Sequence, residues 1–418
     1  MIQASVNQEK IQVINRTLIL DLIRQEGTCS RAALARLSGL RQATITNIVG
    51  GLIHCGLVVE TGLISGERNR RAIGVRLHDE RFKVIGVRLT REMFELSLAG
   101  LSGKTYGCWE YRAEREEDFP AMLARVRAAI QKVVRENPAA EILSACVAVP
   151  GPYHKEEDRL LFVTGIDGWE GCPVRETLAS GLPIPVYIVN DANAGVFAQF
   201  WYGCGDPAAQ NMVYILAGQG IGCGMLVEGK LLLGQQRMAG ELGHSSIQFN
   251  GPPCACGNRG CLETYCSLGT LRQQIAERLR GGADSCLCEN GLTLSAISHA
   301  VRVGDRVACE AYRRACGFLA MGIAGLINQL NPGRIVIGDQ LAEIHPGILL
   351  DVVQKNVSSS VNPLIARNTS IEVSRLHKNS SLLGAAAYAA HQELSNSERF
   401  LTASVRNINF QACSRELA

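Results

Sequence analysis

One short stretch of the 418-residue chain gathers histidine and cysteine: GELGHSSIQFNGPPCACGNRGCLE, residues 240–263. Cys254, Cys256 and Cys261, with His244 ten residues before the first of them, supply three thiolates and one imidazole. Four such ligands form a closed tetrahedral set, which is typical of structural zinc and leaves no position for a catalytic water. A redox pair fits less well, because the spacing is Cys-x-Cys and not Cys-x-x-Cys. The sequence therefore predicts a zinc site, and unliganded thiols are the plainer alternative.

Carboxylates accompany these ligands. Glu241 and Glu263 bracket the set, and a metal loop would hold both rigidly enough to grip sugar hydroxyls. Asp191 follows the strand pattern YIVN and precedes a helix, which would place it in the cleft of an α/β fold, where ligands bind. It could accept a hydroxyl proton there as a general base does, or simply cap the helix. The glycine-rich GQGIGCG (218–224) could bring backbone amides close to a ligand, or form a tight hairpin turn.

Strand and helix patterns alternate from about Lys83 onward, as in KVIGVRL, FPAMLARVRAAIQKVVREN and ILSACVAVPGPY. This order predicts an α/β body of two lobes around a cleft. The chain carries no signal-peptide pattern and no apolar run of the roughly 20 residues that a bilayer span needs. We therefore expect a cytoplasmic protein without membrane insertion, whose cysteines are free thiols or metal ligands.

The first 78 residues differ from the rest in charge. They hold ten Lys/Arg against five Asp/Glu, whereas the remaining 340 hold 32 against 34. A basic head on a slightly acidic body indicates that the head meets a polyanion. NRTLILDLIRQEG (15–27) predicts an amphipathic helix, and CSRAALARLSGL predicts a short helix that Ser30 caps and a turn at Gly39 ends.

A third helix is predicted from RQATITNIVGGLIHCGLV (41–58), with Ile45, Ile48, Val49 and Leu52 buried and a possible bend at Gly50-Gly51. The order of helices predicts a helix-turn-helix whose last helix reads base edges. The strand–turn–strand that follows is predicted to be a wing whose arginines suit phosphates or a minor groove. An ordinary three-helix cap with a basic hairpin is the plainer alternative. The predicted DNA-binding residues are Arg41, Gln42, Thr44, Thr46, Asn47, Arg68, Arg70 and Arg71.

Three motifs carry a resemblance to a known family: NDANA (190–194), GELGH (240–244) and CACGNRGCLE (254–263). By these motifs the chain resembles the ROK family (repressors, open reading frames and sugar kinases), and specifically its transcriptional-regulator branch, from about Asn15 to His391. The resemblance implies a winged helix-turn-helix followed by a two-lobed, actin-like (ribonuclease H-like) sugar-kinase fold of the α/β class. We expect a DNA-binding domain at 1–78, a sugar-binding body at 79–396 and a tail of unassigned role at 397–418.

The resemblance also assigns residues to ligands. Zinc would be held by His244, Cys254, Cys256 and Cys261. A sugar would be contacted by Asn190, Asp191, Glu241, His244 and Glu263. Asp191 would correspond to the base of the kinases. TGIDGW (164–169) lacks an asparagine that family members often place four residues before the tryptophan. Gly165 stands there, so a sugar contact is either lost or supplied by Asp167.

Three nucleotide-facing elements depart from the kinase pattern. The phosphate loop D-x-G-G-T of ROK kinases is replaced by RLTRE (88–92), with Arg88 in place of the aspartate and Thr90 and Arg91 in place of the two glycines. Gln219 stands where kinases commonly have threonine, and Asp339 where a second glycine is common. We therefore predict a sugar-responsive DNA-binding transcriptional regulator, a repressor, whose body senses a sugar without phosphorylating it and contains no catalytic residue.

The expected partners are operator DNA, a small sugar effector and a second copy of the chain. A homodimer would place two winged helices on a palindromic operator. Two alternatives stay open at this point. One is an ATP-dependent sugar kinase with an added DNA-binding head, and the other is a regulator sequestered by a regulatory protein partner.

Overall fold

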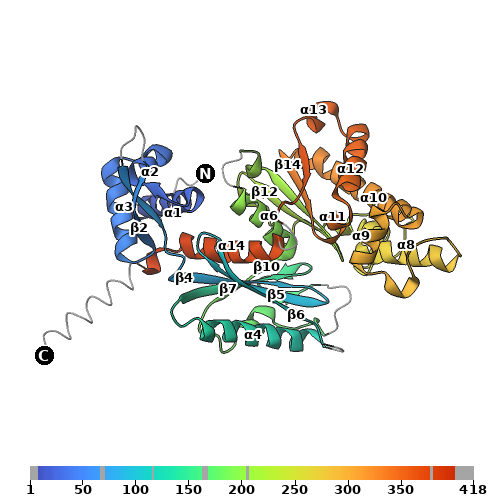
Figure 1. Cartoon of the computed structure of the whole chain (residues 1–418), viewed down its shortest axis with the longest axis horizontal. Helices are drawn as coiled ribbons and strands as arrows, with labels where there is room; N and C mark the ends of the chain where they lie inside the picture. Colours follow the sequence, from blue (N-terminus) through green and yellow to red (C-terminus); the bar gives the residue numbers. More distant parts are fainter. Residues whose placement is uncertain are drawn as a thin grey trace, which may run out of the picture.

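The structure is a computed structural model that describes residues 8–65, 71–114, 117–161, 168–203, 207–376 and 380–400. A small head lies at one end of a larger body, and the body contains two sheets with helices between and around them (Figure 1). The residues of the expected tail from 401 onward lie outside the described ranges.

The described part of the head is a winged helix-turn-helix, as predicted. Its elements are α1 (Gln8–Glu26), β1 (Cys29–Ser30), α2 (Arg31–Ser38), α3 (Gln42–His54), β2 (Val58–Ser65) and β3 (Arg71–Leu77), with the strands in the order β1-β3-β2. The Ser30 hydroxyl accepts the Ala33 amide and caps α2, and Gly39 ends that helix in the left-handed conformation with φ 71°. The third helix runs unbroken through Gly50-Gly51. The two-residue strand β1 was not expected from the sequence.

The two lobes of the body share one strand order. The first lobe contains β4 (Phe82–Leu89), β5 (Met93–Gly100), β6 (Thr105–Arg112), β7 (Glu141–Val149) and β10 (Val186–Asn190), in the order β10-β7-β4-β5-β6. The second contains β11 (Met212–Ala217), β12 (Ile221–Val227), β13 (Lys230–Leu231), β14 (Arg334–Gly338) and β15 (Ser370–Val373), in the order β13-β12-β11-β14-β15. In each sheet an antiparallel meander of three strands is extended by two parallel strands. This duplicated arrangement confirms the two-lobed α/β prediction.

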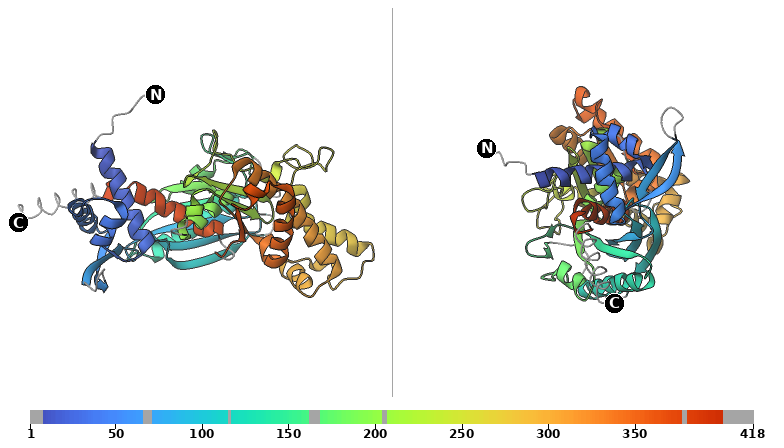
Figure 2. Two further views of the ribbon diagram at one scale, coloured as in Figure 1. Left: turned by 90° about the horizontal axis from the view of Figure 1, so that it is seen from above. Right: turned by 90° about the vertical axis from the view of Figure 1, so that its left-hand side faces the viewer.

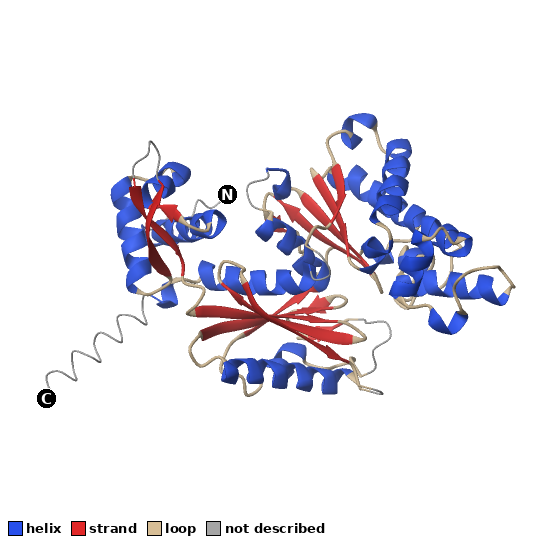
Figure 3. Ribbon diagram, in the orientation of Figure 1, coloured by secondary structure: helices blue, strands red, loops and turns tan. Residues whose placement is uncertain are grey.

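Two helices lie between the sheets (Figure 3). One is α6 (Asp191–Tyr202), which packs on the second sheet, and the other is α14 (Ser380–Ser395), which packs on the first. Their backbones touch, because a Cβ added at Gly384 would lie 1.8 Å from the carbonyl oxygen of Ala194. The Ser381 hydroxyl also donates to the carbonyl of Asp191 over 2.8 Å. The two helices are therefore one tightly joined unit.

The outer faces of the sheets are covered by other helices. Apolar side chains of α4 (Phe119–Glu136) cover the first sheet, and those of α10 (Arg306–Leu330) and α12 (Pro346–Ser360) pack with the core of the second lobe. Among the described helices, none combines the length and apolar character needed to cross a membrane. The shorter elements are β8 (Tyr153–His154), β9 (Arg159–Leu160), α5 (Val174–Ala179), η2 (Pro207–Gln210), η3 (Leu242–His244), α7 (Glu263–Cys266), α8 (Leu268–Arg280), η4 (Glu289–Gly291), α9 (Leu294–Arg302), α11 (Gln340–Ile344) and α13 (Pro363–Ala366).

The head packs directly on the body. Helix α14 runs from between the sheets to the head, as the red helix and the blue head in Figure 2 show, and it contacts α1. Buried apolar residues of the head and of α6 and α14 belong to one continuous cluster. The guanidinium of Arg24 lies 3.9 Å from the centre of the Trp201 ring and donates to the Trp201 carbonyl over 2.8 Å. The chain stays packed up to Phe400, whose ring meets Phe82 edge-on.

Candidate functional site

The predicted base-reading residues lie on the outer face of α3. Ile45, Val49 and Leu52 are buried against the head core, and this fixes which side of the helix is free. Arg41, Gln42, Thr46 and Asn47 are exposed, and Thr44 is partly buried. Polar side chains at the N-terminal end of an exposed helix are what a recognition helix presents to the major groove.

The predicted wing contacts are only partly described. Arg71 is exposed at the start of β3, opposite Ser65 at the end of β2. Arg68 and Arg70 lie outside the described residues. The two strands pair in antiparallel register with an irregularity between Glu60 and Leu63, so the described strands of the wing pair as the sequence predicts.

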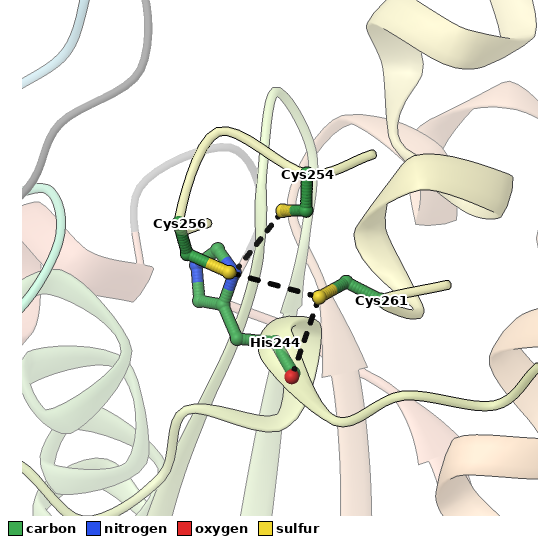
Figure 4. A group of neighbouring side chains, drawn as sticks. All are labelled: His244, Cys254, Cys256 and Cys261. Carbon is green, nitrogen blue, oxygen red and sulfur yellow. Dashed lines mark hydrogen bonds between the residues drawn. The ribbon is translucent and has the colours of Figure 1, made fainter. Parts of the chain in front are cut away.

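The four predicted zinc ligands converge. Their ligand atoms all lie within 4.8 Å of one another, and Figure 4 shows the side chains turned toward a common centre. The Sγ atoms of Cys256 and Cys261 are 3.7 Å apart, and Sγ of Cys254 is 3.6 Å from Nδ1 of His244. Tetrahedral zinc with Zn–S bonds of about 2.3 Å and Zn–N bonds of about 2.05 Å requires separations of roughly 3.8 Å and 3.6 Å. The donor set therefore fits zinc in both chemistry and size.

The backbone of this loop is folded back on itself. The amide of Cys254 donates to the carbonyl of Asn258 over 2.8 Å, and isolated bridges join Ser246 to Cys261 and Pro253 to Arg259. Gly260 has φ 67°, and a Cβ there would lie 1.9 Å from the carbonyl oxygen of Gln248. Only glycine fits that position, so the residues between the cysteines are those that the tight loop requires.

His244 belongs to two sites at once. Its Nδ1 faces the cysteine cluster, whereas its Nε2 lies 4.0 Å from a carboxylate oxygen of Glu241. The same side chain lines a cavity of about 340 Å³ between the lobes, a size within the range of small-molecule sites. A rigid metal loop would thus position a wall of this cavity.

All five predicted sugar-binding residues line the cavity: Asn190, Asp191, Glu241, His244 and Glu263. Their side chains are not equally available. The Asn190 amide oxygen accepts the backbone amides of Ala192 and Asn193, and its nitrogen donates to the Gly151 carbonyl over 3.0 Å. Asn190, not Asp191, is the N-cap of α6. The helix-capping role that was the alternative for Asp191 is therefore performed by Asn190.

The carboxylates of the cavity have unusual environments. Burial raises the pKa of Asp191 to about 7, although the nearby charge of Arg88 lowers it. Burial, with the charges of Asp191 and Glu263, raises the pKa of Glu241 to about 7 as well. Glu263 accepts the Ile221 amide over 2.9 Å, so the glycine-rich hairpin turns an amide toward a carboxylate. Hydrogen-bond acceptors that converge on one cavity suit a ligand rich in hydroxyl groups.

Sequence reasoning missed a pair of contacts across the cleft. Nη2 of Arg88, on β4, donates to Oδ2 of Asp339, after β14, over 2.9 Å. At the mouth of the cavity, Nε2 of Gln219 donates to Oε1 of Glu92 over 3.1 Å. From the sequence, Arg88, Gln219 and Asp339 were recognised only as departures from a kinase pattern. The opposite charges of Arg88 and Asp339 were the one signal that could have indicated a pair.

Comparison with known proteins relates the chain to one family. The model of the ROK family matches residues 84–392. A xylose repressor of Caldicellulosiruptor bescii is 28% identical over 395 residues, which cover 93% of this chain and 98% of that protein. The crystal structure of a ROK family transcriptional regulator, a homologue of the Escherichia coli Mlc protein, superposes with a TM-score of 0.78 at 27% identity, covering 94% of this chain and 99% of that one.

A ROK family glucokinase from Streptomyces griseus, solved with glucose and AMPPNP, has the fold of the body. Its TM-score is 0.65 at 22% identity, and it covers 73% of this chain and 98% of the kinase. The regulator structure thus extends over more of this chain than the kinase structure does.

Proposed function

Because this chain belongs to the ROK family and is similar over nearly its whole length to that family's transcriptional regulators, we propose that it is a sugar-responsive DNA-binding repressor. The head (1–78) would bind operator DNA, and the body (79–396) would bind the sugar. Two copies, acting in the cytoplasm, would place two α3 helices in successive major grooves of a palindromic site.

One observation supports a sensor over an enzyme: carboxylates suited to a sugar line one cavity, and an ion pair lines both that cavity and its neighbour. A second cavity of about 650 Å³ lies beside the first, and Arg88 and Asp339 line both. If the sugar occupied the first cavity and a phosphoryl donor the second, this ion pair would lie where the two cavities adjoin. Phosphoryl transfer depends mainly on positioning and charge neutralisation, and Arg88 is already neutralised by Asp339.

Zinc would be held by His244, Cys254, Cys256 and Cys261, the four residues whose separations fit the ion. A bound structural zinc supplies folding free energy and fixes the loop that carries its ligands. His244 would then present Nε2 to the cavity in one orientation. Glu241 and Glu263, on either side of the loop, would accept hydroxyl groups of the sugar.

The test has two parts. A thermal-shift screen of xylose, glucose, N-acetylglucosamine and their phosphates, with and without ATP, should identify a sugar that stabilises the protein independently of ATP. Fluorescence anisotropy with a genomic fragment selected by the purified protein should then show that this sugar changes DNA affinity, and that Asp191→Asn abolishes the change.

The kinase alternative predicts a different result. Sugar-dependent ATP turnover that is lost in Asp191→Asn would overturn the sensor assignment. A protein that binds DNA but is stabilised by none of these sugars would contradict sugar sensing while leaving the DNA-binding head intact.

A further inference from the structure

Three of the residues that depart from the kinase pattern, Arg88, Gln219 and Asp339, contact partners in the opposite lobe. Arg88 belongs to the first lobe and Asp339 to the second, and their side chains are only 11% and 8% exposed. Glu92 of the first lobe meets Gln219 of the second lobe at the cavity mouth, and Nη1 of Arg272 on α8 lies 3.9 Å from the same Glu92 carboxylate. The cleft is therefore bridged by polar contacts at its floor and at its mouth.

Asp339 is held in an unfavourable backbone conformation. Its φ is 71° and its ψ is −168°, a region that glycine enters freely and other residues rarely enter. Such a conformation persists only where the surroundings stabilise it. Two interactions stabilise it: the carbonyl of Asp339 accepts the Ala342 amide over 3.0 Å, and its carboxylate accepts a hydrogen bond from Arg88. The second contact lies in the cleft, because both residues line the cavity.

We propose that Arg88 and Asp339 form an interlobe latch, which holds the cleft of the sugar-free protein partly closed and so presents both halves of the sugar pocket together. Opening the cleft would separate two opposite charges that now lie side by side away from water. Because water would then solvate both charges, the buried ion pair changes the free energy of cleft opening only modestly. The latch therefore biases the cleft toward closure without locking it.

The latch also adjoins the sugar pocket. Arg88 and Asp191 lie close enough for each charge to affect the ionisation of the other, so a ligand on Asp191 acts beside the latch. The inference rests on the proposed function only in taking the ligand to be a sugar; the bridging contacts are independent of it.

Three variants and one control test the latch. Arg88→Met removes the charge and keeps much of the length of the side chain. Asp339→Asn keeps the shape, and Asp339→Gly removes the carboxylate while relieving the positive φ. The matched control is Arg334→Met, because Arg334 is also a largely buried arginine but pairs with Glu372 on the neighbouring strand of its own lobe.

Hydrogen exchange of the sugar-free proteins, followed by mass spectrometry, should be read at segments 88–93 and 218–222. We expect exchange there to rise at least tenfold in Arg88→Met and in Asp339→Gly, with the radius of gyration from X-ray scattering increased. The control should leave both measurements at the wild-type values. In a double-mutant cycle, combining Arg88→Met with Asp339→Asn should raise exchange little further than either change alone, because each change already removes the same contact.

A sugar that binds the wild type should bind Arg88→Met about tenfold more weakly. Unchanged exchange in a folded Asp339→Gly protein, the variant least open to misfolding, would overturn the latch. An equal rise in Arg334→Met would also overturn it, by showing general loosening. If no sugar binds the wild type, the proposed function fails, but the exchange and scattering results still decide the latch.

Discussion

Arg24 joins the head to α6, the helix that begins at the proposed sugar pocket. Its side chain is only 3% exposed, pairs with Asp21 over 2.8 Å, stacks on Trp201 and donates to the Trp201 carbonyl. Trp201 lies near the end of α6, and Asp191 is the first residue of that helix. Ten residues at 1.5 Å each separate them, or about 15 Å along a rigid rod. A displacement of α6 by the sugar would therefore reach the head through Arg24.

The perturbation is Arg24→Met, which keeps apolar contact and removes the guanidinium. A hydrogen bond from a charged donor is worth about 1.5–3 kcal/mol, and a cation–π contact adds about 0.5–2 kcal/mol. Coupling between ligand sites is typically about 1–3 kcal/mol, so this contact is as strong as the whole effect that it would transmit. We expect the ratio of operator affinities with and without sugar to fall at least about fivefold, toward one.

Anisotropy titrations of operator DNA, with and without saturating sugar, measure that ratio. Sugar affinity without DNA should change less than about threefold, because Arg24 lies far from the pocket. Gln25→Ala is the matched control: Gln25 is exposed and donates to the same Asp21 over 2.7 Å, and it should keep the full response. An Arg24→Met protein with the same affinity ratio as this control would refute transmission through the α1–α6 contact.

Other predictions concern zinc, DNA and pH. Metal analysis should find about one zinc per chain, and Cys256→Ser should lower both zinc content and sugar affinity; full affinity in zinc-free protein would contradict this. Gln42→Ala should cost about 1–3 kcal/mol on operator DNA and little on random DNA, whereas Arg71→Ala should weaken binding to both and flatten the salt dependence. Since the pKa of Asp191 is raised to about 7 and the ionised form accepts hydroxyl groups, sugar affinity should rise between pH 6 and pH 8, less steeply in Asp191→Asn. The free energy of unfolding should change in the opposite direction. Because the pKa of Asp191 is higher in the folded than in the unfolded protein, the folded protein loses stability as the pH rises toward and through 7. Asp191→Asn should reduce that loss in thermal melts.

Local chemistry explains what could be predicted from the sequence. When the ligands of a metal site lie within one short loop, their spacing in the sequence identifies them. His244 and the three cysteines were therefore predicted together. Capping and turn residues act within a few positions, so Ser30 and Gly39 located α2 correctly. The buried face of α3 followed from apolar periodicity, which also identified the outward polar face.

Contacts between distant segments could not be predicted in this way. Arg88 and Asp339 are 251 positions apart, and nothing in the local sequence of either indicates the other. The strand β1 has two residues and exists because β3 pairs with it, which no local pattern encodes. The contact between Arg24 and Trp201 depends on how α6 and α14 extend toward the head, and this is set by packing of the whole body.

The duplicated topology accounts for where the cleft contacts arise. The β4–β5 turn contains Glu92 and the β11–β12 turn contains Gln219, and these are equivalent first hairpins of the two lobes. Turns at equivalent positions of two facing lobes approach one another across the cleft, and glycines there would leave space for phosphate groups. Long polar side chains fill that space and reach each other. On this reasoning the side chains that would remove the room for a phosphoryl donor are the ones that join the lobes, so the proposed absence of kinase activity and the proposed control of cleft closure would have one structural origin.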